Sequence, residues 1–130
     1  MMVIDTDVLI WILRGHDDYK RQFEEAVQTT RGLVFITPVQ VAEITAGVRP
    51  KESDRVHEFL NALNLVNLGR EEGLKAGEFM GAFGKSHSLT LADALIAAVV
   101  KNYSYCLWTL NRKHYPMLNK PDFFEAAVKK

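Results

Sequence analysis

Three acidic residues of this sequence, Asp5, Glu43 and Asp93, lie in largely apolar surroundings, where burial of a carboxylate costs free energy. Asp5 directly follows a short apolar run, and Asp93 is the only polar side chain in the stretch 91–100. Carboxylates that a fold gathers together repel one another, so such a cluster is stable only when it is protonated or holds cations. Oxygen ligands without cysteine or paired histidine favour Mg²⁺ or Mn²⁺, which assist attack on phosphodiesters. The three acids therefore indicate metal-assisted phosphodiester hydrolysis, provided that the fold brings them together.

Each acid also has a structural interpretation that involves no chemistry. Asp5, or Asp7 two residues later, is suited to capping the helix that follows. Glu43 is compatible with a surface position, although the small and apolar residues on both sides of its helix predict that it does not point freely into solvent. Thr90 is a candidate N-cap for the next acid's helix, with the Asp93 carboxylate reaching back to the Thr90 amide. A helix start can also hold a catalytic carboxylate in place, so both interpretations remain open.

The chain alternates short apolar strands with helices. The predicted strands comprise residues 2–5, 33–36, 65–68 and 105–109, and the predicted helices comprise residues 8–13, 19–27, 38–47, 56–63, 70–83 and 91–100. A loop at 111–116 and a short element around 123–124 complete the chain. The clearest helix start has Thr37 as N-cap, Pro38 in the first position and Gln40 three residues after the cap. This alternation predicts an α/β fold with a mainly parallel sheet.

The predicted sheet also indicates where a site would lie. In parallel sheets, ligands bind beyond the carboxyl ends of the strands. Asp5 and Asp7 directly follow the first predicted strand, and the helices that carry Glu43 and Asp93 each adjoin a strand in sequence. We therefore expect these acids to meet at one edge of the sheet.

The composition is typical of a globular domain. The chain has 130 residues, of which 48% are hydrophobic and 25% charged, and we expect one domain over residues 1–130. The apolar run at 94–100 is too short to cross a membrane, and the N-terminus has no secretory-signal pattern. The single cysteine, Cys106, can form neither an intramolecular disulfide nor a zinc site by itself. These features favour a cytoplasmic protein without a membrane partner.

The charges balance overall but are unevenly distributed. The 16 basic and 16 acidic residues cancel, which argues against a general electrostatic binder of nucleic acid. Residues 101–130 nevertheless carry a surplus of four positive charges, and the first hundred residues carry the opposite surplus. The basic residues of this segment are Lys101, Arg112, Lys113, Lys120, Lys129 and Lys130, and the acidic ones are Asp122 and Glu125. The segment is either an ordinary solvated surface or a positive rim for a polyanion beside the acidic site.

Four stretches of the sequence match a known family in their order and spacing. They are VIDTDVLI (3–10), ITPVQVAEITAGV (36–48), SLTLADALIAA (88–98) and LWTLNRKHYPML (107–118). On these stretches the protein resembles PIN-domain ribonucleases, and specifically the VapC-type toxins of toxin–antitoxin pairs. The resemblance implies a three-layer α/β/α sandwich around a mainly parallel sheet. It also implies hydrolysis of RNA with Mg²⁺ or Mn²⁺ as the cofactor.

The same resemblance assigns roles to individual residues. Asp5, Glu43 and Asp93 match the catalytic acids that hold the metal. Further supporting positions are matched by Thr6, Asp7, Thr109 and Asn111. Among these, Thr6 matches a position that supports the first acid, whereas Asp7 matches a more variable one.

One position departs from the family pattern. A fourth acid is common just before the aromatic residue of the last motif, whereas this chain has His114 before Tyr115. A histidine at this point would contact phosphate, bind Mn²⁺ better than Mg²⁺ or support another ligand. The alternative is a purely structural His114 beside a site with three acids and one metal. The departure leaves open whether one or two metal ions bind. The neighbouring Arg112 and Lys113 are candidates for positioning the RNA backbone.

The resemblance implies two protein partners. VapC-type toxins usually form homodimers and are held inactive by a cognate antitoxin whose C-terminal segment covers the site. Exposed apolar residues on the early helices are candidates for such contacts, among them Trp11, Ile12, Phe59 and Leu60. Taken singly, each of them fits a plain core position better.

Two other functions fit parts of the pattern. A PIN-like domain without catalytic activity would only bind RNA or protein, and His114 in place of an acid allows this. The stretch DTDV (5–8) also resembles the DxDx[TV] motif of haloacid-dehalogenase phosphatases, in which the first acid is a nucleophile. Those enzymes need a later lysine and paired acids after another strand, and no paired acids lie near residues 107–109.

Overall fold

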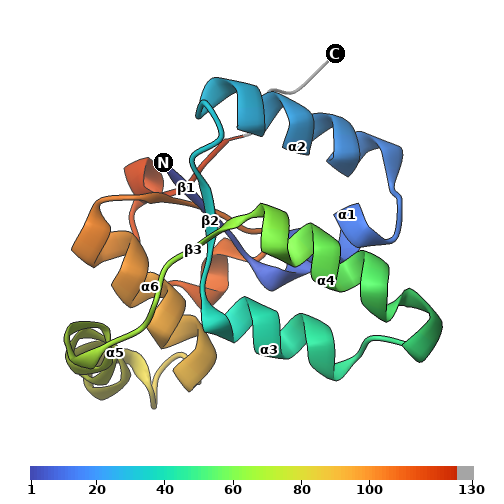
Figure 1. The fold of residues 1–130 in the computed structure, drawn as a ribbon. Helices are drawn as coiled ribbons and strands as arrows, with labels where there is room; N and C mark the ends of the chain where they lie inside the picture. The colour runs from blue at the N-terminus through green and yellow to red at the C-terminus, as the bar shows by residue number, and fades with distance from the viewer. Residues whose placement is uncertain (126–130) are drawn as a thin grey trace.

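Within residues 1–125, which the computed structural model describes, four short parallel strands form the centre of the molecule (Figure 1). The strands are β1 (Met2–Ile4), β2 (Val34–Ile36), β3 (Asn64–Leu65) and β4 (Cys106–Trp108). They lie in the order β3-β2-β1-β4, and every neighbouring pair is parallel. All four carboxyl ends therefore lie at the same edge of the sheet. Because β1 lies between β2 and β4, Asp5 follows a central strand at that edge.

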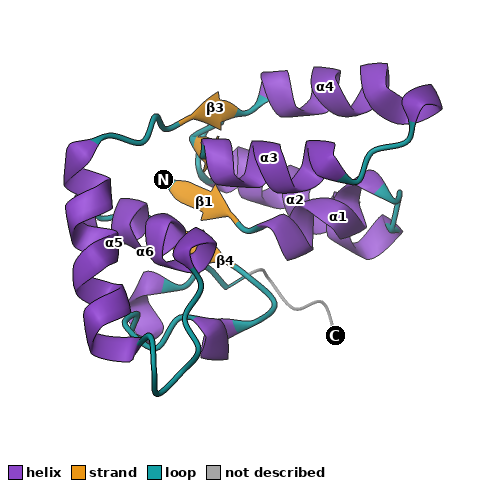
Figure 2. Cartoon of the chain, turned by 90° about the horizontal axis from the view of Figure 1, so that it is seen from below, coloured by secondary structure: helices purple, strands orange, loops and turns teal. Residues whose placement is uncertain are grey.

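Helices cover both faces of this sheet. They are α1 (Thr6–Leu13), α2 (Asp17–Thr29), α3 (Pro38–Ala46), α4 (Ser53–Ala62), α5 (Arg70–Phe83) and α6 (Leu91–Tyr103), with short 3₁₀ turns at Pro50–Glu52, Arg112–His114 and Lys120–Asp122. Figure 2 shows α5 and α6 on one side of the strands and α1 to α4 on the other. The predicted three-layer α/β/α sandwich with a parallel sheet is confirmed. No helix in this described part of the chain is long and apolar enough to cross a membrane.

Successive residues of β1 point into two separate apolar cores, as the two-residue period of a strand requires. Val3 belongs to the core of α5 and α6, together with Leu107 and Tyr115. Met2 and Ile4 belong to the opposite core, which contains buried residues of α1, α2 and α4. β1 is thus buried on both faces, which is typical of a central parallel strand.

Capping residues start the helices that border the carboxyl edge. Thr37 Oγ1 accepts a hydrogen bond from Val39 N at 3.0 Å, and the capping box predicted with Gln40 is confirmed. Thr90 Oγ1 accepts from Asp93 N at 3.1 Å, so the predicted N-cap of α6 is confirmed as well. These caps fix the starts of α3 and α6. Asp93 projects from the first turn of α6, and Glu43 lies one turn further along α3.

The side chain of Gln40 also joins α3 to β1. It is fully buried, and its Nε2 donates to the Ile4 carbonyl oxygen at 3.0 Å. Its Oε1 accepts from Thr37 N at 3.0 Å and from the Thr37 hydroxyl. One amide therefore satisfies buried backbone groups at the end of β1 and at the start of α3.

Some boundaries differ from those predicted. β3 comprises Asn64–Leu65 rather than 65–68. Val66 still donates its amide to Ile36 O of β2, and its side chain packs into the core of α5 and α6. α6 continues past its predicted end to Tyr103, and Ser104 closes it in the left-handed conformation with φ of 56°. The predicted loop 111–116 contains a 3₁₀ turn.

Two of the four apolar residues predicted as protein contacts are not exposed. Ile12 is 7% exposed and Leu60 is 6% exposed, so they are not available as contacts, and the alternative prediction of a core position is confirmed for both. Phe59 is half-buried and packs against the ring of Phe23 at 5.6 Å. Trp11, at 38% exposure, is the member of the set that a partner could reach most easily.

Replacing Gln40 with Leu is expected to lower the free energy of unfolding by about 2–4 kcal/mol, because the buried Ile4 carbonyl and Thr37 amide lose their partner. Chemical denaturation followed by circular dichroism measures the change. Gln28→Leu, at an exposed position of α2, is the control and should alter stability by less than about 0.5 kcal/mol. Equal effects of the two substitutions would show that the Gln40 amide does not hold β1 and α3 together.

Candidate active site

Asp5 is fixed in place by three hydrogen-bond donors. It is the N-cap of α1, and its Oδ1 accepts from Thr6 N at 2.8 Å. Its Oδ2 accepts from Thr109 Oγ1 at 2.8 Å and from the Tyr115 hydroxyl at 2.7 Å. These donors come from both ends of the chain. Asp5 is 8% exposed, so its carboxylate is largely removed from water. The capping role and a role in a site are therefore compatible in this residue.

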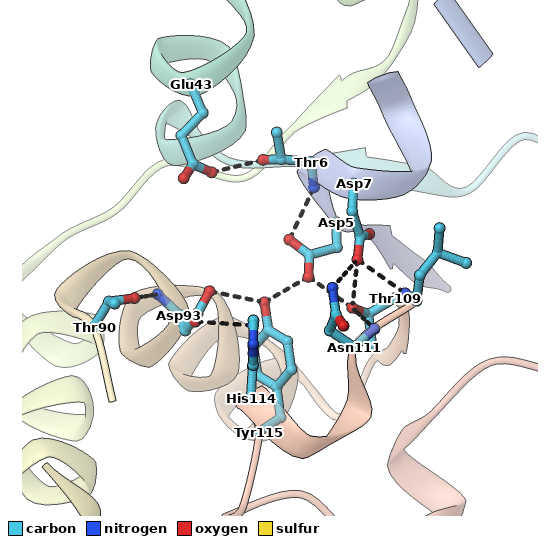
Figure 3. Close-up of polar contacts among 11 residues, drawn as sticks. Asp5, Thr6, Asp7, Glu43, Thr90, Asp93, Thr109, Asn111, His114 and Tyr115 are labelled. Atoms are coloured by element: carbon cyan, nitrogen blue, oxygen red, sulfur yellow. Dashed lines mark hydrogen bonds and ion pairs between the residues drawn. The ribbon is translucent and has the colours of Figure 1, made fainter. Parts of the chain in front are cut away.

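Asp93 lies opposite Asp5 at the start of α6 (Figure 3). Its Oδ1 is 3.3 Å from the Tyr115 hydroxyl, and its Oδ2 is 3.9 Å from His114 Nδ1. The His114 side chain is 53% exposed, so it borders the site on the solvent side. The Tyr115 hydroxyl therefore lies between the two carboxylates, and His114 lies beyond the second one.

Glu43 lies at the rim of the same group of residues. Its side chain is exposed, so the expectation that it does not point freely into solvent is wrong; the small residues around it on α3 leave it uncovered. Its Oε1 nevertheless accepts from Thr6 Oγ1 at 2.6 Å. Since the amide of Thr6 is bonded to Asp5, a continuous series of contacts runs from Glu43 through Thr6, Asp5 and Tyr115 to Asp93 (Figure 3). The three predicted acids thus share one edge of the sheet.

Asp7 binds the segment after β4. Its Oδ2 accepts from Leu110 N at 3.1 Å, from Asn111 Nδ2 at 3.2 Å and from Thr109 Oγ1 at 3.4 Å. Its Oδ1 is buried and has no hydrogen-bond partner among residues 1–125. Asn111 N also donates to Thr109 Oγ1 at 3.1 Å. Asp7, Thr109 and Asn111 together hold the end of β4 against the start of α1, as expected of supporting residues.

Burial and the charge of Asp5 raise the pKa values of the ionisable groups around it. Burial raises the pKa of the Asp93 carboxyl above its usual value, and the charge of Asp5 raises it further. The same two causes, in the same order, raise the pKa of Asp7. Burial followed by the charge of Asp5 also raises the pKa of the Tyr115 hydroxyl, which therefore stays protonated and able to donate. The metal-free site is electrostatically unfavourable, as expected of a group of side chains that binds a cation.

The basic rim predicted from residues 101–130 is partly neutralised. Lys101 Nζ pairs with Asp122 at 2.7 Å, and the Arg112 guanidinium lies 4.8 Å from the Phe123 ring centre and 3.6 Å from Glu125 Oε1. Lys113 is exposed and forms no ion pair within the described part of the chain. Lys129 and Lys130 lie outside the described residues.

The residues present fit a divalent cation held mainly by two acids. No group of three or more His, Cys, Asp or Glu side chains in residues 1–125 is close enough together to hold a metal ion as the side chains lie. Mg²⁺, however, is usually bound by one or two carboxylates and completes its shell with water and phosphate oxygens. Asp5 and Asp93 meet this requirement, because both offer oxygen ligands and their charges repel in the absence of a cation. Glu43 is placed to join them from the rim.

The sequence pattern does not identify Tyr115 as a site residue, because there it is only the aromatic residue of the last motif. In the structure, Tyr115 is 1% exposed and its hydroxyl contacts both central acids. A usable signal was present, since a buried tyrosine hydroxyl needs a hydrogen-bond partner. The phosphatase alternative gains nothing from the structure, because β4 is followed by Thr109 and Asn111 rather than by paired acids.

Comparisons with known proteins agree with this architecture. The family model of the PIN domain matches residues 2–115. A toxin–antitoxin complex from Klebsiella pneumoniae has a similar fold, with 21% identity, a TM-score of 0.71 and coverage of 95% of this chain and 100% of that chain. VapBC2 from Rickettsia felis bound to a promoter DNA fragment has 19% identity, a TM-score of 0.77 and coverage of 95% and 96%. DNA-bound VapBC from Salmonella typhimurium has 13% identity, a TM-score of 0.75 and coverage of 88% and 89%.

At these identities, the solved structures establish a shared fold. No curated protein sequence matches the chain. The family match, by contrast, spans nearly the whole of the described structure and includes Asp5, Glu43, Asp93 and Tyr115. The chain belongs to the PIN domain family.

Proposed function

We propose that the protein is a metal-dependent endoribonuclease and the toxin of a VapC-type toxin–antitoxin pair. The observation that supports this most directly is the convergence of Asp5 and Asp93 on the Tyr115 hydroxyl, at the carboxyl edge of a parallel sheet in a PIN domain. Asp5 directly follows β1 and Asp93 lies in α6, so the two acids are far apart in sequence. Their mutual repulsion gives a divalent cation a favourable binding position.

The cation would be Mg²⁺ or Mn²⁺, and Asp5 and Asp93 would hold it, with Glu43 as a third acid. When bound, such an ion supplies Lewis-acid polarisation of a phosphoryl group and lowers the pKa of water for in-line attack. Hydrolysis would leave a 5′-phosphate and a 3′-hydroxyl on the RNA. Thr6 and Thr109 orient the Asp5 carboxylate through hydrogen bonds at 2.8 Å, so that the ligand is in position before the substrate arrives.

Two basic side chains beside the acids are suited to the RNA backbone. Lys113 is exposed next to the site and would contact a phosphate. His114, 3.9 Å from Asp93, would contact the same backbone or support that acid. Arg112 is directed toward Phe123 and Glu125, so its contribution to RNA binding would require it to leave that ion pair.

An antitoxin is the proposed protein partner, because the similar solved structures include toxin–antitoxin complexes. A groove of about 470 Å³ between α1, α3 and α4 reaches Glu43 and would accept a segment that covers the site. It is lined by Ile10, Leu13, Arg14, Glu43, Ile44, Gly47, Val48, Glu52, Arg55 and Val56. A homodimer in the cytoplasm is a further part of the proposal.

The purified chain, freed of any partner, is expected to cleave RNA with Mn²⁺ or Mg²⁺ and to stop in EDTA. Asp93→Asn should lower the cleavage rate by about 10²-fold or more, since it removes a group that stabilises charge in the transition state. The measurement is a gel-based cleavage assay on a labelled RNA, with Glu58→Gln, an exposed acid of α4, as the control that keeps wild-type activity. A protein that binds RNA but never cuts it with either metal would instead be a catalytically inactive PIN domain.

Asp93→Asn should raise Tm in the absence of metal and should reduce the gain in Tm that metal gives. In EDTA, Asp93→Asn is expected to raise Tm by about 2–5 °C, because it removes the charge that Asp5 repels. With saturating Mn²⁺ the wild type should gain more than the variant, since only the wild type keeps both ligands. Differential scanning fluorimetry gives both values. A variant that is less stable than the wild type in EDTA would indicate that the two acids do not strain the metal-free fold.

Lys113→Ala is expected to weaken RNA binding most at low salt. The slope of log affinity against log salt concentration should fall in magnitude by about 1, because one phosphate contact is lost. Fluorescence anisotropy in EDTA, where no cleavage occurs, measures the dissociation constant at several salt concentrations. Lys51→Ala, in the exposed 3₁₀ turn before α4, is the matched control and should leave the slope unchanged. An unchanged slope for Lys113→Ala would place the RNA elsewhere.

A further inference from the structure

The Tyr115 hydroxyl is the group that links the two central acids. Among the hydrogen bonds of residues 1–125, no other side chain contacts both Asp5 and Asp93. The contact to Asp5 Oδ2, at 2.7 Å, is the shorter one, and Asp93 Oδ1 lies at 3.3 Å from the same oxygen. Because a hydroxyl has one proton, Tyr115 donates it mainly to Asp5, and its contact with Asp93 is the weaker one.

We propose that Tyr115 is a positioning residue whose hydroxyl fixes Asp5 and Asp93 relative to each other, and that it thereby sets the affinity of the two acids for a divalent cation. This proposal rests on the proposed function, because it takes the two acids as the metal ligands. Without the cation, the neutral hydroxyl offsets part of their repulsion. With the cation bound, the hydroxyl keeps its short bond to Asp5 and orients that ligand.

The other contacts of the two acids cannot do this. Thr109 and the Thr6 amide hold Asp5 but do not contact Asp93. On the other side, Asp93 contacts Thr90, which does not reach Asp5, and it has His114 at 3.9 Å, which is too far for a hydrogen bond. Removing the Tyr115 hydroxyl would therefore leave no side chain that contacts both acids.

The position of the hydroxyl is itself well fixed. Tyr115 N donates to the Arg112 carbonyl oxygen at 2.9 Å, which closes the 3₁₀ turn before it. The Tyr115 side chain is 1% exposed and is packed in the core with residues of α6, including Ala97. A ring held by packing on all sides cannot swing away from the acids, and this is what a ligand-positioning group requires. A phenylalanine would fill the same space but would leave the acids unlinked.

The test is Tyr115→Phe, which keeps the packing and removes the hydroxyl. Isothermal titration of the purified full chain with Mn²⁺ should show a dissociation constant raised by about 10–100-fold, the usual effect of losing a group that orients a metal ligand. Tyr105→Phe is the matched control. Tyr105 directly precedes β4, so it lies at the opposite end of that strand from the acids, and its ring stacks on that of Phe35 with 5.0 Å between the ring centres. The control should bind Mn²⁺ as the wild type does.

Cleavage as a function of Mn²⁺ concentration gives a second readout. If Tyr115 acts through metal affinity, the activity lost by Tyr115→Phe at low Mn²⁺ returns toward the wild-type rate when Mn²⁺ saturates the site. A purely structural role would lower Tm without changing the dissociation constant. Wild-type Mn²⁺ affinity in the variant, or activity that stays low at saturating Mn²⁺, overturns the proposal.

These outcomes can be told apart from a failure of the proposed function. A wild-type protein that neither binds Mn²⁺ nor cuts RNA refutes the proposed function, whatever the variant does. A wild-type protein that binds and cuts, beside an indistinguishable Tyr115→Phe variant, refutes the role of Tyr115 alone. Should the variant not fold, the near-ultraviolet difference spectrum of the wild type with Mg²⁺ decides: a perturbed tyrosine band supports the proposal, and an unperturbed one overturns it.

Discussion

Repulsion between Asp5 and Asp93 at the buried edge of the sheet is the interaction on which the organisation of this site depends. Burial raises the pKa of Asp93, and the charge of Asp5 raises it further, so the two carboxylates destabilise each other when both are ionised. Hydrogen bonds to Asp5 from the Thr6 amide, Thr109 and Tyr115 offset part of this cost. Under the proposed function, the remainder would be the electrostatic basis for binding a cation. The same geometry would then lower the stability of the protein without metal and create its affinity for metal.

The topology of the parallel sheet brings these groups together. β1 lies between β2 and β4, so the residues that follow it meet the residues that follow its neighbours. Asp5 both caps α1 and faces the site, and Asp93 projects from the capped first turn of α6. Because each acid is attached at the end of a rigid element, its position is set by the packing of the sheet and helices rather than by a flexible loop. Asp7, with Thr109 and Asn111, ties the end of β4 to the start of α1 and completes this arrangement.

Under the proposed function, the distribution of charge suits a site that binds RNA weakly until the reacting phosphate is engaged. The chain has no net charge, and two cations of its C-terminal part, Lys101 and Arg112, pair with the nearby acids Asp122 and Glu125. General attraction to a polyanion is therefore small. Local groups such as Lys113 and His114, together with a cation at the acids, would supply the remaining affinity. Within the proposed function, binding and hydrolysis would thus depend on the same few groups at the edge of the sheet.

The sequence by itself determined the α/β alternation and the starts of α3 and α6, because strand and helix periodicity and capping depend on residues that are near one another in the chain. It also identified Asp5, Glu43 and Asp93 as candidate site acids. Only the tertiary structure showed that Asp7 binds the segment after β4, that Glu43 is exposed yet tied to Thr6, and that Ile12 and Leu60 are buried. Above all, it placed the Tyr115 hydroxyl against Asp5, a residue 110 positions away in sequence. No local pattern predicts such a contact, because the distance between two distant side chains is decided by how the sheet and helices pack.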